Sequence, residues 1–482
     1  MPSRYRPPRP LIVLRLKRDA FALFTRSPFV IVNNVLTVGM TYRKLITSAA
    51  AISFLIGGVG VAFDAFAHDE THDNHKDFTL IYAGQVLAVP GKPPITNATI
   101  IVHDGKIVGI EDGFLEDEDA TIIDKREMFF LPGLIDSHVH LRGDRDSGKP
   151  DDAVRLEAGD VALTAAGHAR TTLMAGFTAV QDVGGPKEIF ALRRAINAGK
   201  VPGPHIKAAG SAISATGGHG DFHGFKDDIL EMMQSETVCD GVADCRRAVR
   251  QAVKNGADVI KVTATGGVLS DTNAGTGQQL MDDELKAIVE TATTMGRKVT
   301  AHAHDKGGIE AALRAGIQSI EHGSFLDKET TRLFRQKDAV LVPTVLAGKT
   351  VEEWAKDPDT FLPPNSIKKA LEVGPKMQEM ARIAYQNGVT IAFGTDTGVS
   401  KHGENAKEFE YMMVAGMSAQ EAIASATVVA AKHIGMDDKI GSLEEGKFAD
   451  LIGVNGNPLT DIQELMDVDF VMKGGIIHKD EP

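Results

Sequence analysis

The chain has 482 residues, more than one average domain, and its composition is globular, with 43% hydrophobic and 24% charged residues. Its formal net charge of −13 at pH 7 comes without a basic patch, which argues against nucleic acid or an anionic membrane as a partner. The absence of internal repeats and of long low-complexity tracts excludes a solenoid or a mainly disordered protein.

Residues 1–67 differ in character from the rest of the chain. The basic pair Arg43 and Lys44 precedes an apolar run over residues 45–63, and a small-x-small pattern ends at Ala67. This order is typical of a cleaved signal peptide. We therefore predict a leader and signal peptide, cleavage near Ala67, and a periplasmic or secreted mature protein with no stable membrane anchor. A transmembrane anchor is the alternative, because the apolar run is nearly long enough to span a bilayer.

The two ends of the mature chain share one pattern. Residues 68–131 contain short alternating runs separated by turn residues, such as FTLIYAGQVLAVPG and ATIIVHDGKIVGIEDG. Residues 437–482 have the same character in GSLEEGKFADLIGVNG and DVDFVMKGGIIHK. Such runs predict antiparallel strands. We expect the two ends to pair into a small β-sandwich that flanks the middle of the chain.

The middle, residues 132–436, alternates apolar strands with amphipathic helical stretches such as MDDELKAIVETATTMG. This alternation predicts parallel βα units, and eight such units are the content of a (β/α)8 TIM-type barrel. An open doubly wound sheet is the alternative, but no strand is followed by a G-x-G-x-x-G turn. The predicted strands are LIDSHVH, FTAVQDVG, HIKAAG, DVIKVT, KVTAHAH, QSIEHG, VLVPT and TIAFGTD.

The chain has two cysteines, Cys239 and Cys245. In an oxidising compartment they could close a short disulfide loop, and otherwise they would be two free thiols. They lack the spacing of a zinc knuckle and no further cysteine could complete one. We give neither cysteine a catalytic role and leave both pairing states open.

Polar side chains gather at the predicted strand ends. Because residues i and i+2 share one face of a strand, His138 and His140 can both point into the mouth of a barrel. Active sites of TIM-type barrels lie at this end, and converging imidazoles and carboxylates suit zinc or a similar divalent ion. The set is His138 and His140 on the first strand, Lys261 in the fourth, His302 and His304 on the fifth, His322 on the sixth and Asp396 on the eighth.

Each of these residues also has an ordinary explanation. A single histidine near a strand end is more often a hydrogen-bonded structural residue than a ligand. Lys261 could pair with a carboxylate or form a Schiff base, and Asp396 could cap the next helix. For all of these explanations to hold together, five strands would each have to place such a residue at the correct end by chance. That is much less expected than an ordinary explanation for any single residue. The set as a whole therefore indicates a metal site.

The motifs LPGLIDSHVHL, DVIKVTATGG, AHAH, SIEHG and FGTDTG resemble the amidohydrolase superfamily, and the resemblance covers essentially the whole mature chain. It is strongest to the branch of imidazolonepropionase-related enzymes, prolidase-like carboxypeptidases and ochratoxin-hydrolysing amidohydrolases. The resemblance implies two divalent metal ions, of which zinc is expected. One ion would be bound by His138, His140 and Asp396. The other would be bound by His302 and His322, and Lys261, carboxylated by CO2, would bridge the two.

The resemblance also implies a reaction. A metal-activated hydroxide would attack an amide carbonyl, and Asp396 would carry the proton to the leaving amine. His304 and His219 are expected to contact the substrate, whereas ordinary solvent-facing turns are an equally good reading for the loop histidines His219, His223 and His402. The substrate would be a small amide or peptide. The expected reaction is cleavage of the bond to a C-terminal amino acid in dipeptides or N-acyl amino acids, a class that includes ochratoxin A.

Two other functions remain open from the sequence. A cyclic amide hydrolase of the imidazolonepropionase type has the same motifs, but a cytosolic enzyme of that kind would not need a signal peptide. A non-catalytic barrel is the third reading, which the intact set of potential ligands opposes. Relatives of this branch often form homo-oligomers, and we expect the same of this chain.

Overall fold

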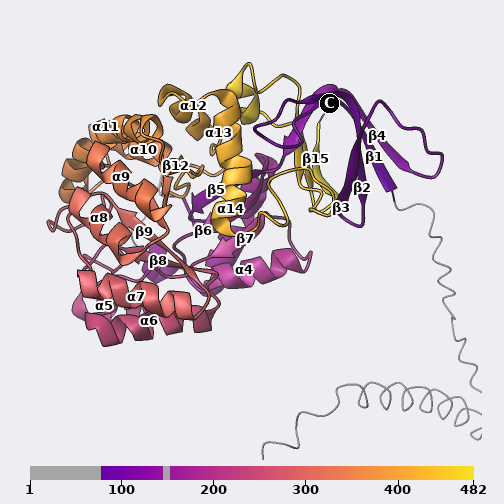
Figure 1. The fold of residues 1–482 in the computed structure, drawn as a ribbon. Coiled ribbons are helices and arrows are strands. Elements are labelled where there is room, and N and C mark those ends of the chain that lie inside the picture. Colours follow the sequence, from indigo (N-terminus) through magenta and orange to yellow (C-terminus); the bar gives the residue numbers. More distant parts are fainter. Residues whose placement is uncertain (1–77, 145–151, 482) are drawn as a thin grey trace, which may run out of the picture. The chain divides into compact units, whose positions relative to one another are not determined.

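The computed structural model describes residues 78–144 and 152–481. The predicted leader and signal peptide lie outside these residues, as do residues 68–77 of the predicted sandwich. Two assemblies of strands are present, one built from both ends of the described chain and one from its middle (Figure 1). Within residues 78–144 and 152–481 no helix has both the length and the apolar character that crossing a membrane requires.

The two chain ends form one seven-stranded sheet, where we had expected two facing sheets. The N-terminal strands join the C-terminal ones through antiparallel pairing of Phe129–Pro132 with Leu451–Val454, so the predicted association of the two ends is present. The order is β15 (Ile476–Asp480), β14 (Phe470–Lys473), β13 (Leu451–Val454), β4 (Thr121–Pro132), β1 (Phe78–Val86), β2 (Ile95–His103) and β3 (Lys106–Asp112).

This sheet curls around its own core instead of packing on a second sheet. The backbone N–H of Ile107 on β3 donates to the carbonyl of Lys447, and that of Ala449 donates to the carbonyl of Gly105. These bonds bring one sheet edge to the loop before β13. The result is an apolar interior formed by residues such as Ile81, Ile100, Ile107, Phe130 and Phe470.

Eight parallel strands from the middle of the chain lie where the sequence predicts them. They are β5 (Leu134–Val139), β6 (Phe177–Asp182), β7 (His205–Ala208), β8 (Val259–Thr263), β9 (Lys298–Ala303), β10 (Ser319–His322), β11 (Val340–Val342) and β12 (Thr390–Ile391). They form one sheet of order β5-β6-β7 and another of order β12-β11-β10-β9-β8, with parallel pairing throughout.

The two sheets meet at both of their edges. On one side the N–H of Ile213, beyond β7, donates to the carbonyl of Lys261 on β8. On the other side the N–H of Asp396 donates to the carbonyl of His138 on β5, and Val139 forms a parallel bridge with Thr397. Regular pairing in β12 covers only two residues, so Asp396 lies in an extended segment beyond that strand. This is the α/β arrangement of a TIM-type protein.

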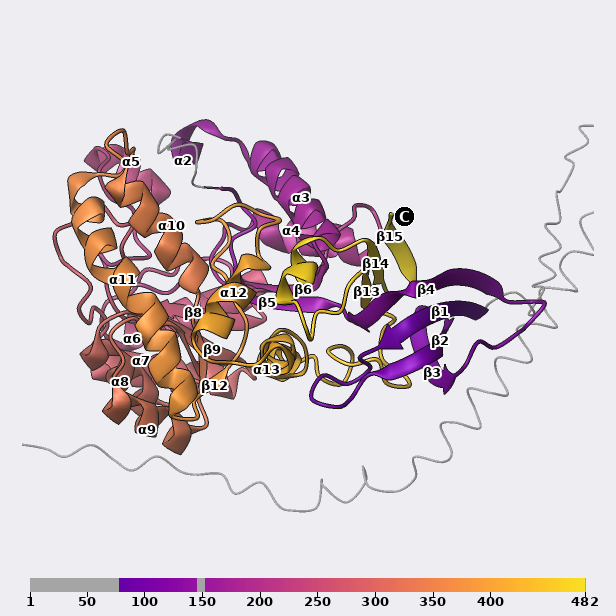
Figure 2. The same cartoon turned by 90° about the horizontal axis from the view of Figure 1, so that it is seen from above.

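The helices follow the strands and cover them, as the view from above shows (Figure 2). Their ends follow local sequence rules: Asp305 caps α8 by accepting from the N–H groups of Gly307 and Gly308, and Gly316 ends α8 in the left-handed region. The helices are α2 (Asp152–Arg155), α3 (Ala158–Met174), α4 (Glu188–Asn197), α5 (Asp227–Met233), α6 (Gly241–Asn255), α7 (Asp282–Thr294), α8 (Lys306–Ala315), α9 (Lys328–Lys337), α10 (Val345–Lys356), α11 (Pro364–Gln386), α12 (Lys407–Val414), α13 (Ala419–Ala424) and α14 (Ala430–Ile434), with a π-helix at Ser425–Val429 and a 3-10 helix at Ile462–Met466.

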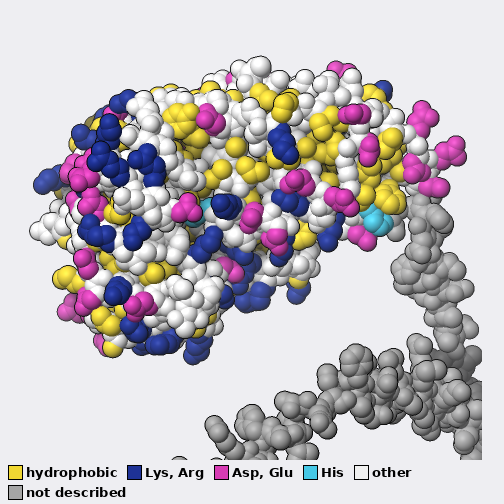
Figure 3. Space-filling view, in the orientation of Figure 1, with side chains coloured by type: hydrophobic (Ala, Val, Ile, Leu, Met, Phe, Trp, Pro, Cys, Tyr) yellow, Lys and Arg dark blue, Asp and Glu magenta, His cyan; other side chains and the backbone are white. Residues whose placement is uncertain are grey.

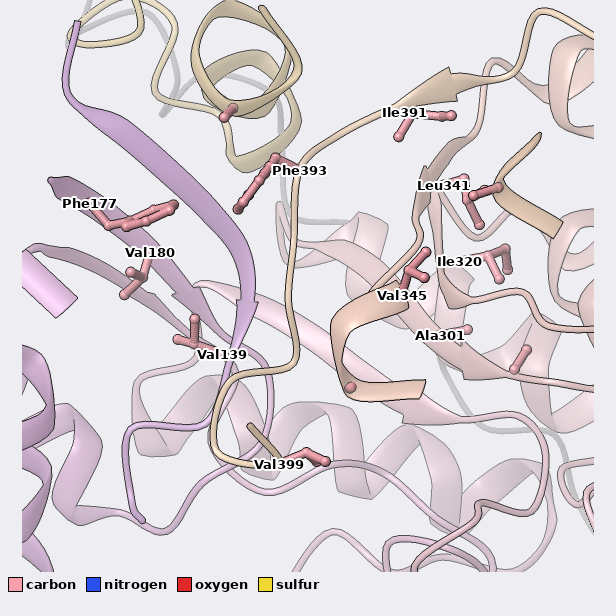
Figure 4. Close-up of a cluster of buried hydrophobic side chains, with 14 of the residues drawn as sticks. Val139, Phe177, Val180, Ala301, Ile320, Leu341, Val345, Ile391, Phe393 and Val399 are labelled. Atoms are coloured by element: carbon pink, nitrogen blue, oxygen red, sulfur yellow. The ribbon is translucent and has the colours of Figure 1, made fainter. Parts of the chain in front are cut away.

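The largest core lies between the eight parallel strands and these helices. Figure 4 shows part of it, where Phe177 of β6 lies beside Phe393 and Ile320 of β10 lies near Leu341 of β11, with Val180 also in this core. All five side chains are fully buried. Such packing fixes the strands laterally, and therefore fixes the positions of the polar residues at their ends.

Cys239 and Cys245 form a disulfide that ties the segment before α6 to its first turn. The disulfide decides between the two pairing states that the sequence left open. On the surface, Figure 3 shows acidic and basic side chains interspersed, with hydrophobic ones between them over the seven-stranded sheet. Ile476 and Ile477 on the edge strand β15 are among the exposed hydrophobic residues.

Candidate metal centre

Side chains from β5 and from the segment beyond β12 meet at one carboxylate. Asp396 Oδ1 lies 3.0 Å from His140 Nε2 and 3.4 Å from His138 Nε2. One ligand atom each of His138, His322 and Asp396 lies within 4.8 Å of the others. These residues come from three strand ends that are far apart in the sequence, as the strand assignment predicts.

The Nδ1 atoms of His138 on β5 and of His140, which follows it, are held by acceptors. His138 Nδ1 donates to the carboxylate of Glu321 at 2.6 Å, and His140 Nδ1 donates to the carbonyl of Gly184 at 2.7 Å. Each Nδ1 therefore carries a hydrogen, and each Nε2 points toward Asp396. Burial alone would lower the pKa of His138, but the carboxylates of Asp396 and Glu321 raise it. Three electron-pair donors converging in a buried place require a cation or added protons. A divalent ion satisfies that requirement with the donor types it prefers.

Three further histidines complete the cluster. The ring centroid of His322 lies 4.6 Å from that of His302 and 5.0 Å from that of His304. Burial, reinforced by neighbouring positive charges, holds the pKa of His302 and of His322 well below the usual value, and burial lowers the pKa of His304 to about 4. All three rings are therefore neutral at pH 7 and have an electron pair to offer.

Asp396 and Lys261 show opposite effects of burial. Burial alone would raise the pKa of Asp396, but the charges and hydrogen bonds of His138 and His140 bring it well below its usual range, so the carboxylate is ionised. Lys261 on β8 is 5% exposed, and burial lowers the pKa of its ammonium despite the nearby carboxylates of Glu321 and Asp396. The positive charge of Lys261 in turn lowers the pKa of His322, which places the lysine beside the cluster.

The backbone is left-handed at several of these strand ends. His322 has φ 73° and Asp396 has φ 58°, and Thr344, whose Oγ1 lies 2.7 Å from His322 Nδ1, has φ 50°. Such conformations cost non-glycine residues of order 1 kcal/mol or more each, and they persist where the surroundings fix them, often at functional sites. Their recurrence at these strand ends supports a functional role for this part of the molecule.

Two buried carboxylates that sequence reasoning passed over hold the cluster in place. Glu321, which precedes His322, accepts from His138 and from the hydroxyl of Thr300. Asp136 accepts from the backbone N–H of His138 and the side chain of Asn405, and burial raises its pKa to about 6. Both stand within two residues of a predicted ligand, on the strand itself. That proximity was the only signal, since polar residues on strands have no distinctive spacing.

The loop histidines are placed differently from one another. His219 reaches the cluster, because its ring centroid lies 4.2 Å from that of His302 and its Nδ1 lies 2.6 Å from Ser270 Oγ. His223 instead contacts the carbonyl of Gly218 within its own loop. His402 is buried against His168 on α3, so the solvent-facing reading of this loop residue was wrong.

Comparison with known proteins agrees with this geometry. Residues 129–477 match the Amidohydrolase family. The chain is 36% identical to ochratoxinase of Aspergillus niger over an alignment of 436 residues, which covers 83% of this chain and 86% of that protein. It is 26% identical to imidazolonepropionase of Symbiobacterium thermophilum, over 78% of this chain and 90% of the relative.

A solved structure extends the similarity to three dimensions. The crystal structure of a Xaa-Pro dipeptidase with bound methionine in the active site superposes with a TM-score of 0.79. It is 41% identical and covers 83% of this chain and 100% of its own. The predicted resemblance is thereby confirmed. The chain belongs to the amidohydrolase family.

Proposed function

We propose that the protein is a metal-dependent hydrolase that cleaves the amide bond to a C-terminal amino acid in dipeptides or N-acyl amino acids. The observation that carries this proposal is the convergence of His138 Nε2 and His140 Nε2 on Asp396 Oδ1. The substrate class is supported by the names of the similar proteins, a Xaa-Pro dipeptidase and an ochratoxinase. Both act on substrates of the proposed kind, in which an acyl group is linked to an amino acid.

The residues suit two ions, which we expect to be zinc. His138, His140 and Asp396 would hold one, and His302 and His322 would hold the other. We propose that Lys261 is carboxylated by CO2 and bridges them. Its lowered pKa favours the neutral amine, which is the nucleophilic form that adds to CO2 with loss of a proton. The product carries a negative charge and oxygen ligands, whereas an ammonium would repel a cation.

The chemistry then divides between the ions and the chain. Bound divalent ions would lower the pKa of a water molecule and polarise the scissile carbonyl. Asp396, ionised and next to both β5 histidines, is placed to take a proton from the attacking water and to give it to the leaving amine. Glu321 and the carbonyl of Gly184 keep His138 and His140 in the tautomer that the site needs.

We propose His304 and His219 as residues that contact the substrate, because they come from different loops and both rings lie against that of His302. The centroid of His302 lies 4.6 Å from that of His304 and 4.2 Å from that of His219. A substrate bound at these ions would therefore lie next to both rings.

The test is product release by residues 68–482 after zinc loading. Dipeptides, N-acyl amino acids, ochratoxin A and cyclic amides would each be incubated and read by mass spectrometry, with a chelated control. We expect release of a C-terminal amino acid that stops on chelation. Exclusive turnover of cyclic amides would replace the proposed substrate class by the imidazolonepropionase type. No turnover of any substrate by metal-loaded protein would contradict the proposal.

Two variants test the roles within the site. In Lys261→Ala and in Asp396→Asn we expect kcat/KM to fall by more than about 100-fold, since even residues behind metal ligands typically account for 10- to 100-fold. His223→Gln is the matched control, because His223 contacts only its own loop carbonyl among the hydrogen bonds described. Full activity in both site variants would refute the mechanism.

The localisation and the oligomeric state of the protein are separate proposals. We propose that residues 1–67 are removed near Ala67, that the mature enzyme works in the periplasm or outside the cell, and that it forms a homo-oligomer. N-terminal sequencing of the protein from its source and light scattering of the mature chain test these points. An intact N-terminus, or a monomer at micromolar concentration, would contradict them.

A further inference from the structure

A second cluster of ligand-type side chains lies outside the metal centre. Asp144 follows β5, His168 lies on α3, and His402 lies in the loop beyond β12. Each offers one ligand atom, and these three atoms lie within 4.8 Å of one another. The cluster shares no residue with His138, His322 and Asp396, which form the other such group within residues 78–144 and 152–481.

The distances within this cluster suit a cation between the side chains. His402 Nε2 lies 3.4 Å from Asp144 Oδ1, and His168 Nε2 lies 3.7 Å from Asp144 Oδ2. Both separations exceed an ordinary N–H···O hydrogen bond of about 2.7–3.2 Å. Two ligands at about 2.0–2.1 Å from a tetrahedral zinc ion are roughly 3.4 Å apart. The side chains are therefore spaced as ligands of one ion.

The far sides of both rings are engaged, as in metal-binding histidines. His168 Nδ1 donates to the carbonyl of Leu141 at 3.1 Å, and His402 Nδ1 lies 3.4 Å from Thr172 Oγ1. Thr172 lies one turn after His168 on α3. Both Nε2 atoms face Asp144, and each would offer a lone pair there once an ion is bound. The two rings are stacked, with centroids 4.3 Å apart and planes within 20°.

His402 supplies an independent sign that a partner belongs here. The residue is 8% exposed and its side chain 1% exposed, so it is nine-tenths buried. Its Nε2 has no hydrogen-bond partner among the residues that the structure describes. A buried polar atom without a partner costs about 1–3 kcal/mol. An ion shared with Asp144 and His168 would remove that cost.

We propose that Asp144, His168 and His402 form a second metal site for one divalent ion of zinc-like preference, separate from the catalytic centre. Two imidazoles and a carboxylate are a borderline-soft donor set that favours zinc over magnesium or calcium. The ion fastens the loops after β5 and β12 to α3. Those loops continue from the strands that carry His138, His140 and Asp396, so the site stabilises the surroundings of the reaction centre.

The experiment counts metal in the full mature chain. Asp144→Asn is the main variant, because this carboxylate is 25% exposed and the amide keeps its shape. His168→Gln is the second variant. Metal-free protein would be loaded with Zn²⁺ or Co²⁺, and bound metal would be measured by elemental analysis and by the cobalt absorption spectrum. We expect each variant to bind one equivalent less than the wild type, or to bind it about tenfold or more weakly in chelator competition.

Two controls make the result specific. The same variants in an Asp396→Asn background separate this site from the catalytic one, because adding Asp144→Asn should remove one further equivalent from that background, whether or not the ion held by His302 and His322 is retained. His205→Gln is the matched control, since His205 Nε2 lies 3.1 Å from Asp450 without a third ligand. Circular dichroism of the metal-free variants verifies folding. Unchanged metal content and cobalt spectrum in folded Asp144→Asn and His168→Gln would overturn the proposal, whether or not the catalytic centre binds metal.

Discussion

Glu321 lies behind the predicted ligand His138, so its substitution tests the metal centre without removing a ligand. Its carboxylate accepts from His138 Nδ1 at 2.6 Å and is fully buried. Burial alone would raise its pKa, but His138 brings the pKa below the usual value, so the carboxylate is charged. A charged acceptor behind a ligand both orients the imidazole and makes it a better donor.

We predict that Glu321→Gln weakens zinc binding at the catalytic centre by about 10- to 100-fold while the fold is kept. The amide preserves the shape but removes the charge behind His138. Chelator competition measures the affinity, and circular dichroism monitors folding. Glu329→Gln on the exposed surface of α9 is the control. Equal affinity in wild type and Glu321→Gln would show that His138 does not depend on this carboxylate.

The candidate ligands could be predicted from sequence because strand periodicity fixes the face and end on which they lie. His138, His322 and Asp396 meet in the structure although they come from the first, sixth and last strands. Glu321 and Asp136 could not be recognised, since a carboxylate within a strand gives no sign of which partner it will face. The burial of His402 depends on α3, a helix that lies far from it in the sequence.

At the scale of single elements, α14 carries a titratable group that matters for acid stability. His433 is 8% exposed, and burial lowers its pKa to about 4. An unfolded chain would titrate it near 6.5. The unfolded state therefore gains a proton as the pH falls from about 6.5 to 4, and the folded state does not. The free energy of unfolding must decrease over that window.

We predict that His433→Phe reduces this acid sensitivity. Between pH 7.5 and 5 the wild type should lose about 2 kcal/mol of unfolding free energy through His433, and the variant should not lose that part. Urea denaturation at both pH values, with metal-free protein, measures the difference. His103→Phe, at a partly exposed position on β2, serves as a control. An identical loss in wild type and His433→Phe would mean that His433 is protonated in the folded protein.

The elements themselves were predicted with unequal success. All eight parallel strands lie where their apolar runs indicated, and α7 fills the helical stretch named from the sequence. Regular pairing in the last strand is shorter than predicted, because Phe393 to Thr397 pair with β5 by separate bonds rather than with β11. The two chain ends form a single sheet and not the predicted sandwich. The strand pattern predicts that one face of the sheet is buried, but it does not predict which elements cover that face.

At the scale of the whole molecule, the seven-stranded sheet makes the C-terminal strands essential to the N-terminal ones. β4 pairs with β1 on one side and with β13 on the other, and Phe130 of β4 packs on Phe470 of β14 at 5.5 Å between ring centroids. Removing β13 and β14 would expose both the edge of β4 and the apolar core of the sheet.

We predict that truncation after residue 446 abolishes soluble expression of the mature chain. Truncation after residue 474 removes only the exposed edge strand β15 and its ion pair between Lys125 and Asp480, and it should leave a folded protein that binds metal. The soluble fraction and circular dichroism distinguish the outcomes. A soluble, folded chain that ends at residue 446 would show that the middle of the molecule does not need this sheet.

The same pairing has a consequence for the order in which the molecule is made. β4 is synthesised early, whereas the strand that covers its edge, β13, leaves the ribosome only after all eight parallel strands. Contacts of such long sequence separation form slowly, and an open strand edge invites pairing with another chain. The nascent protein therefore passes most of its synthesis with an uncovered β-edge, and we expect its yield to depend on chaperones that bind extended segments.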